Sequence, residues 1–132
     1  MIKIFLNGTF DLVHTGHLKL INYAKSLGDY LYVAIDSDER VKEKKGKDRP
    51  INKLSDRKFL LENLKSVDEV LSFSTDFELS NIVKNLNPDI MIVGSDYRNK
   101  KVIGSEYAKS LIFFERIPEY ASTKIIQSII NR

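Results

Sequence analysis

The stretch Ile2–Gly28, with the sequence IKIFLNGTFDLVHTGHLKLINYAKSLG, decides the fold. It opens with a short apolar run, Ile2–Leu6, that ends at Asn7-Gly8, which predicts a buried strand. Further on, apolar residues at helical spacing predict a helix over Gly16–Leu27, which Gly28 stops. A strand, a turn and a helix in this order form the first unit of an α/β fold.

The remainder of the chain repeats this alternation. Further strands are predicted over Tyr30–Ile35, Val67–Phe73, Ile90–Val93 and Leu111–Phe114. Helices are predicted after Ser55, which can cap one of them, and over Phe77–Leu86 and Ser122–Ile130, whereas the charged stretch Asp38–Asn52 is predicted to be a loop. We therefore expect an α/β fold: a single Rossmann-like domain over residues 1–132, with a five-stranded parallel sheet and helices on both faces.

Composition limits the chemistry that is available. The 132 residues include two histidines and no cysteine, which excludes disulfides, a thiolate metal site and a cysteine nucleophile. A net charge of +3 suits an anionic ligand without requiring nucleic acid. No apolar run approaches the roughly 20 residues that cross a bilayer, and the N-terminus lacks signal-peptide features. We expect a cytoplasmic enzyme or binding domain without a membrane partner and without a metal site built by the protein.

Both histidines lie in the turn between the first strand and the first helix. His14 and His17 flank Gly16 where backbone N–H groups and the helix dipole favour a phosphate. A lone histidine is usually an incidental surface residue. Two histidines around one glycine at such a turn favour a phosphate-binding role instead.

The segment Gly8-Thr9-Phe10-Asp11, followed by His14-Thr15-Gly16-His17, resembles the cytidylyltransferase-like nucleotidyltransferases, which are marked by an HxGH motif. The resemblance extends over essentially the whole chain. It implies that a phosphate oxygen of an acceptor attacks the α-phosphorus of a nucleoside triphosphate and that pyrophosphate leaves. An enzyme for this reaction mainly positions its substrates and neutralises charge.

The resemblance also implies roles for the residues of this turn. His14 and His17 would hold the triphosphate and stabilise charge at the α-phosphate. Nucleotide contacts are expected from Gly8, Thr9, Phe10, Asp11 and Gly16. For Asp11 the alternatives are that it orients a histidine or that it shapes the turn.

A catalytic lysine is implied in the charged stretch after the second strand. Lys42 and Lys45 fit the expected spacing before Gly46, and Lys44 is a competitor. The alternative is that these lysines belong to an ordinary solvated loop.

The segment Arg49–Arg57, with the sequence RPINKLSDR, resembles the branch of the family that acts on heptose 1-phosphate. Arg57 would lie in the first turn of a helix, where the dipole disfavours a cation, so we expect it to have an anionic partner. The candidates are Asp56, Asp68 and a ligand, and a structural salt bridge is the alternative. Together with Asp36, Arg57 is assigned to the acceptor.

Two later motifs complete the expected nucleotide site. Asp96 and Tyr97, after the fourth strand, match an aspartate–aromatic pair that would contact ribose and base. Val93 departs from the lysine that the heptose branch usually has there. Arg116 resembles the triphosphate clamp of the glycerol-3-phosphate cytidylyltransferases. Ser122 and Thr123 match a phosphate-binding motif, and an ordinary helix N-cap is the alternative for them.

The expected function is therefore transfer of CMP or AMP from CTP or ATP to the phosphate of a small phosphorylated polyol or sugar, of the glycerol 3-phosphate or heptose 1-phosphate type. Mg²⁺ is expected to arrive with the triphosphate, and the resemblance implies a homodimer. The alternative is a non-catalytic nucleotide-binding sensor or scaffold. A nucleic-acid-binding domain is disfavoured because acidic residues interrupt the basic stretch.

Overall fold

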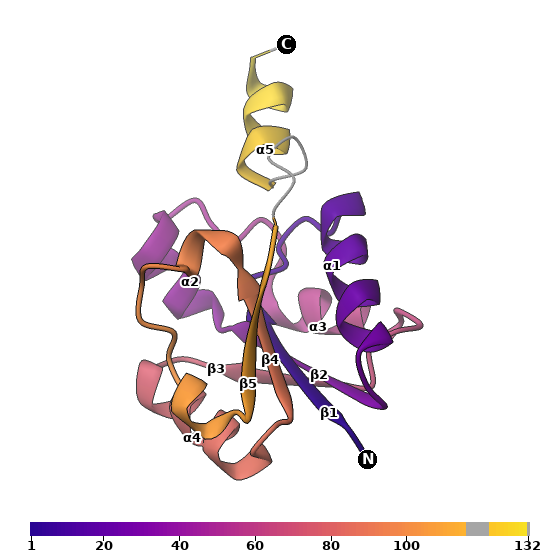
Figure 1. Cartoon of the computed structure of the whole chain (residues 1–132). Coiled ribbons are helices and arrows are strands. Elements are labelled where there is room, and N and C mark those ends of the chain that lie inside the picture. The colour runs from indigo at the N-terminus through magenta and orange to yellow at the C-terminus, as the bar shows by residue number, and fades with distance from the viewer. Residues whose placement is uncertain (116–121, 132) are drawn as a thin grey trace.

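Five parallel strands form one sheet in the computed structural model, which describes residues 1–115 and 122–131 (Figure 1). The strands lie in the order β3-β2-β1-β4-β5. They are β1 (Lys3–Gly8), β2 (Tyr30–Asp36), β3 (Glu69–Phe73), β4 (Ile90–Gly94) and β5 (Ser110–Phe114). The helices are α1 (Thr15–Ser26), α2 (Asp38–Lys45), α3 (Leu54–Glu62), α4 (Asp76–Leu86) and α5 (Ser122–Ile130), with 3-10 turns η1 (Ser95–Tyr97) and η2 (Ser105–Tyr107). The predicted parallel α/β sheet and all five predicted strands are confirmed.

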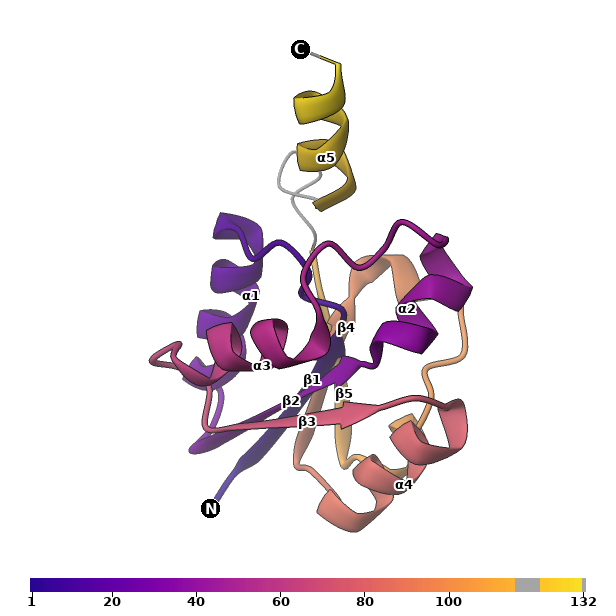
Figure 2. The ribbon, with the colours of Figure 1, turned by 180° about the vertical axis from the view of Figure 1, so that it is seen from behind.

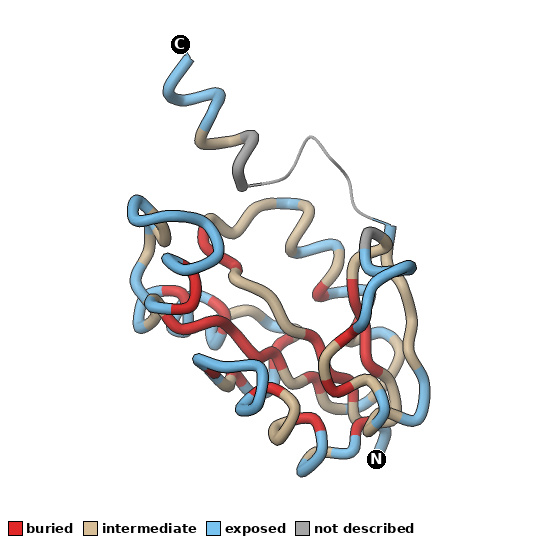
Figure 3. The backbone as a smooth tube through the Cα atoms, turned by 90° about the vertical axis from the view of Figure 1, so that its left-hand side faces the viewer, coloured by how far each residue is buried: buried red, intermediate tan, exposed pale blue. Residues whose placement is uncertain are grey.

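Alternate side chains of each strand pack into two separate cores, one on each face of the sheet. Leu6 of β1 packs in the core that includes Ile21 of α1 and Leu61 of α3. Phe5, the preceding residue, points to the opposite core, which includes Val83 of α4. Figures 1 and 2 show the corresponding layers, and in Figure 3 the buried positions concentrate in the middle of the molecule. The prediction of helices on both faces is confirmed.

The carboxyl ends of the strands meet at one edge of the sheet. Asp36 at the end of β2 pairs with Phe73 at the end of β3, and Gly94 at the end of β4 pairs with Phe114 of β5. The chain passes from β1 to β2 on one side and from β4 to β5 on the other, so the strand order switches between β1 and β4. Ligands of open parallel sheets bind beyond the carboxyl ends at such a switch point.

The prediction of a loop over Asp38–Asn52 is wrong for its first part, which forms α2. Ser37 caps this helix, because its Oγ accepts the N–H of Arg40 at 3.3 Å. Acidic residues occupy the first turn and lysines the last, an order that complements the helix dipole. Arg40 and Val41 are buried and give the helix an inward side. High charge density favoured a loop, whereas the order of the charges along the axis favours a helix.

The prediction that Ser55 caps the next helix is also wrong. α3 begins at Leu54, and Lys53 at its N-cap makes no side-chain capping bond. Instead, the N–H of Leu54 donates to Oδ1 of Asp38 at 2.9 Å. A carboxylate from α2 therefore satisfies the first amide of α3, which links the two helices.

The other predicted helices are confirmed. α1 ends before Gly28, and α4 begins at a capping box formed by Thr75 and Glu78. α5 occupies the predicted range and lies beyond the end of β5 (Figure 1). Among the helices that the structure describes, none has the length and apolar character needed to cross a membrane.

Candidate active site

The two histidines form a stacked pair that caps α1. Nδ1 of His14 accepts the N–H of Gly16 at 3.1 Å, and Nδ1 of His17 accepts the N–H of His14 at 3.2 Å. The ring centroids are 3.8 Å apart, with planes inclined by 24°. Because both Nδ1 atoms accept hydrogen bonds, each neutral ring carries its proton on Nε2. Nε2 of His14 is shielded from solvent.

The turn before the histidines has a shape that only certain residues permit. Phe10 adopts a left-handed backbone conformation with φ of 51°, and its buried ring lies 5.0 Å from the ring of His17. A Cβ atom on Gly8 would come within 2.9 Å of the Phe10 ring. Gly8 therefore leaves room for Phe10, which supports the His17 ring. Both residues shape the turn, and their predicted contact with the nucleotide stays a prediction.

Asp11 is buried and fastens a second segment to this turn. Its carboxylate accepts the N–H groups of Ile51 and Asn52 at 2.7 Å each, and Nε of Arg49 at 3.3 Å. The backbone carbonyl of Asp11 also accepts Nδ2 of Asn52 at 2.8 Å. Both carboxylate oxygens hold protein groups, and the predicted contact of Asp11 with the nucleotide stays a prediction. Of the two alternatives, the shaping of the turn is the one that the geometry supports.

Arg57 has a different place from the one predicted. The whole residue is buried, with 0% exposure, and its guanidinium pairs with Asp38 at 2.6 Å. The expected partners Asp56 and Asp68 are therefore wrong, and the structural salt bridge is correct. Burial this complete also contradicts direct contact between Arg57 and an acceptor, because all four of its described hydrogen bonds end on protein oxygens.

Asp36, the other residue assigned to the acceptor, is held by a neighbouring arginine. Its Oδ2 accepts Nε of Arg40 at 3.1 Å, and Nη2 of Arg40 reaches Asp76 at 2.6 Å. The Arg40 guanidinium also lies 5.1 Å from the centre of the Phe73 ring. The hydrogen bond from Arg40 lowers the pKa of Asp76 below its usual value. Arg40 thus ties α2 to the ends of β2 and β3 and to the start of α4.

The three lysines of α2 differ in the direction in which they point. Lys42, Lys44 and Lys45 are exposed in the last turn. Lys44 follows Arg40 by four residues and so lies on the side of the helix where Arg40 pairs with Asp76 of α4. Lys42 and Lys45 follow Asp38 by four and seven residues and so share its side of the helix. Lys42 and Lys45, the two lysines predicted to bind phosphate, can therefore both lie on the side of α2 that carries Asp38.

The end of β4 places Tyr97 at the switch point. This residue is 44% exposed in η1, and Nζ of Lys100 lies 5.6 Å from the centre of its ring. Val93 is buried in the core on the α4 side of the sheet. The structure does not describe Arg116 or the side chains of Asp96, Ser122 and Thr123, so the predictions for these residues lie outside the described part of the chain.

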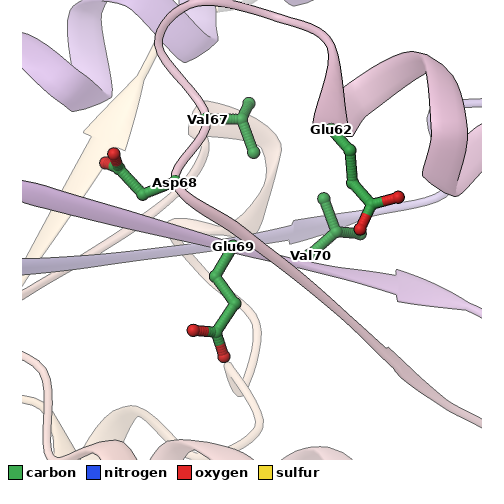
Figure 4. Close-up of a pocket in the computed structure, with 5 residues that line it drawn as sticks. All are labelled: Glu62, Val67, Asp68, Glu69 and Val70. Atoms are coloured by element: carbon green, nitrogen blue, oxygen red, sulfur yellow. The ribbon is translucent and has the colours of Figure 1, made fainter.

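Two hollows lie away from the histidine turn. A space of about 250 Å³ opens beside the start of β3, lined by Val67, Val70 and three acidic residues, Glu62, Asp68 and Glu69 (Figure 4). Three carboxylates repel a triphosphate, so this hollow is unsuited to the expected substrate. A second, of about 320 Å³, lies between α4 and the segment before β5. Within the described ranges, no group of three histidine, aspartate or glutamate side chains is arranged to hold a metal.

Sequence reasoning missed three residues of this edge, namely Asp38, Arg40 and Asn52. Each is polar and makes contacts far along the chain, for example Asp38 with Arg57 and Asn52 with Asp11. No pattern among neighbouring residues points to these contacts, because their partners lie far away in the sequence.

Comparison with known proteins agrees with this geometry. The cytidylyltransferase-like family profile matches residues 5–128. Over 126 residues, which is 96% of the chain, the sequence is 44% identical to bifunctional protein HldE of Helicobacter hepaticus and 43% identical to that of Campylobacter fetus. The chain spans only 26% and 27% of the length of these two curated relatives.

Solved structures show the same architecture. A lipopolysaccharide core biosynthesis protein from Thermoplasma volcanium superposes with a TM-score of 0.72 at 27% identity, over 87% of this chain and 98% of that chain. A protein of unknown function from Archaeoglobus fulgidus, at 18% identity and a TM-score of 0.64, supports the fold alone. Because the family profile matches residues 5–128 of the 132, the chain belongs to the cytidylyltransferase-like family of nucleotidyltransferases.

Proposed function

We propose that this domain transfers a nucleoside monophosphate, AMP or CMP from ATP or CTP, to the phosphate of a small phosphorylated sugar, with heptose 1-phosphate as the first candidate. The observation that carries the proposal is the stacked His14–His17 pair at the N-terminus of α1, beside the β1–β4 switch point. The resemblance of Arg49–Arg57 to the heptose branch and the identity to the HldE proteins support this acceptor.

In the proposed reaction, an acceptor phosphate oxygen attacks the α-phosphorus and the bond from that phosphorus to the bridging oxygen of pyrophosphate breaks. Negative charge grows on the non-bridging α-phosphate oxygens and on the leaving pyrophosphate. Nε2–H groups of His14 and His17 donate to these oxygens, with support from the dipole of α1. Lys42 and Lys45 neutralise the outer phosphates. No proton has to be removed from an acceptor that is already a phosphate dianion.

Mg²⁺ is part of this proposal as a companion of the triphosphate. The ion prefers oxygen ligands and keeps much of its water. The turn offers imidazole nitrogens and amides, and the carboxylate of Asp11 is occupied by protein groups. These residues fit an ion held by phosphate oxygens and water. When bound, it would supply charge neutralisation on the triphosphate.

A second candidate keeps the reaction and changes the substrates. Gly8–His17 and Arg116 resemble the glycerol-3-phosphate cytidylyltransferases, and Val93 replaces the lysine expected in the heptose branch. CTP with glycerol 3-phosphate is therefore the alternative pair. The homodimer and the cytoplasmic location stay predictions.

Pyrophosphate release tests the proposal directly. The chain is incubated with ATP, CTP, GTP or UTP against heptose 1-phosphate, glycerol 3-phosphate and other phosphorylated sugars and polyols. We expect release with heptose 1-phosphate and one of ATP and CTP. Nucleotide binding without release in any combination would favour the sensor or scaffold instead.

A further inference from the structure

One buried guanidinium joins the chain segments that surround the histidine turn. Nη1 of Arg57 donates to the carbonyl of Thr9 at 3.1 Å and to that of Asp36 at 2.8 Å. Nε donates to the carbonyl of Asn52 at 2.9 Å, and Nη2 to Asp38 at 2.6 Å. The turn after β1, the end of β2, the start of α2 and the segment before α3 therefore meet at one side chain.

Asp38 connects the Arg57 guanidinium to α2. It is the first residue of the helix, and its Oδ1 accepts both Nη2 of Arg57 and the N–H of Leu54. Two donors on one carboxylate oxygen fix the side of α2 that faces Arg57. The guanidinium suits this task because its planar donors have a fixed geometry.

The rotation of α2 decides where its lysines point. Residues four and seven positions after Asp38 lie on the same side of the helix, and these are Lys42 and Lys45. Lys44 follows Arg40, which pairs with Asp76, by four residues and so lies on the other side of the helix, the side that faces α4. A change in the Asp38–Arg57 contact would turn Lys42 and Lys45 away together.

We infer that Asp38 and Arg57 are positioning residues that direct Lys42 and Lys45 toward the phosphates held at the histidine turn. The inference rests on the proposed function. Arg57 is fully buried, and Oδ1 of Asp38 is bound to Arg57 and Leu54, so we assign both to positioning and not to substrate contact. Breaking a buried pair is strongly destabilising, yet an intact pair adds little net stability over apolar packing. A geometric role explains why a charge pair occupies this position.

A mutant cycle separates positioning from stability. Pyrophosphate release gives kcat and KM for the triphosphate in the wild type, in Asp38→Ala, in a Lys42→Ala/Lys45→Ala variant and in the combined variant. Residues that act as one unit give non-additive effects. We expect Asp38→Ala to raise KM about tenfold in the wild type and less than about twofold when both lysines are absent. Asp38→Asn, which keeps one acceptor oxygen, should recover part of the loss.

Asp89→Asn is the matched control. Asp89 also accepts a backbone N–H, from Lys3, and a lysine, Lys109, but at the opposite edge of the sheet. The Asp89→Asn variant should have a lower melting temperature than the wild type and the same KM for the triphosphate. If the increases in KM from Asp38→Ala and from the two lysine changes multiply in the combined variant, the inference is overturned while the function stands. The same holds if the lysine variant has the KM of the wild type. A wild type that releases no pyrophosphate would overturn both.

Discussion

The two edges of the sheet use charged side chains in different ways. At the carboxyl edge, the polar and charged residues that are buried in the described chain come together: Asp11, Asp36, Ser37, Arg40 and Arg57. At the amino edge, aspartates close the strand starts from partly exposed positions. Asp68 accepts the N–H of Leu31, and Asp89 accepts that of Lys3, each with a lysine beside it.

This difference separates geometry from stability. Moving an ion from water into the protein interior costs about several kcal/mol, and pairing with an opposite charge offsets this cost. Replacing such a buried pair by well-packed apolar side chains often leaves the free energy of unfolding unchanged. The amino edge shows that this chain can close strand ends with exposed pairs. The buried network therefore coincides with the edge that carries the histidines, where a fixed backbone shape is required for chemistry.

The largest expected effect is on catalysis at the carboxyl edge. His14→Ala and His17→Ala should each reduce kcat by at least about a hundredfold, because each removes a donor to the developing charge. Pyrophosphate release measures this. His14→Asn is the matched control for capping, since asparagine is a good N-cap but lacks Nε2. A His14→Asn variant with wild-type turnover would show that His14 only caps α1.

The next effect concerns stability, and it compares the two edges directly. Arg57→Met should lower the free energy of unfolding by about 3–5 kcal/mol, because it leaves the Asp38 carboxylate and three carbonyls without their donor. Lys25→Met, which breaks the partly exposed pair with Asp68, should cost less than about 1 kcal/mol. Urea unfolding measures both, and equal losses would contradict the distinction between the edges.

A smaller loss is expected from Asp11→Asn. One carboxamide oxygen cannot replace two carboxylate oxygens that accept from Ile51, Asn52 and Arg49. We expect a loss of about 1–3 kcal/mol in the free energy of unfolding, for a buried donor left unsatisfied. Slower amide hydrogen exchange at Ile51 and Asn52 in the wild type than in the variant would locate the loss. Unchanged exchange there would contradict the fastening role of Asp11.

The smallest expected effect is a pH dependence from the amino edge. Burial opposes ionisation of Asp68, but hydrogen bonds from Lys25 and from the N–H of Leu31 outweigh it and lower its pKa below 3.8. The unfolded chain then binds this proton more readily than the folded one. The stabilisation is present above about pH 4 and is lost as pH falls through the lowered pKa. Asp68→Asn should flatten the decline of the melting temperature below pH 4, and an unchanged decline would contradict it.

Local patterns predicted the sheet, and they placed the two histidines in one turn at its carboxyl edge. Apolar runs and helical spacing are properties of neighbouring residues, so Ile2–Leu6 and Gly16–Leu27 could be identified without tertiary information. The histidine pair was recognisable because both residues fall in one turn. The order of charges along α2, acidic first and basic last, is also visible in the sequence and indicates a helix. The high share of charged residues in that segment led to the prediction of a loop instead.

Long-range polar contacts were beyond local patterns. Arg57 pairs with Asp38, which is 19 positions away in the sequence, and Arg49 pairs with Asp11, which is 38 positions away. The resemblance suggested Arg57 as an acceptor contact, whereas burial makes it an anchor. Such partners depend on how the carboxyl ends of β1 and β2 come together, which only the folded chain shows.

The fate of the α-phosphorus tests the central claim most directly. Triphosphate radiolabelled at the α-phosphorus, and separately at the γ-phosphorus, is incubated with the chain and a phosphorylated sugar. Nucleotidyl transfer at the His14–His17 pair predicts that the α-label enters a product joined to the sugar phosphate and that the γ-label leaves as pyrophosphate. A γ-label on the sugar, or an α-label that never joins it, would contradict the account.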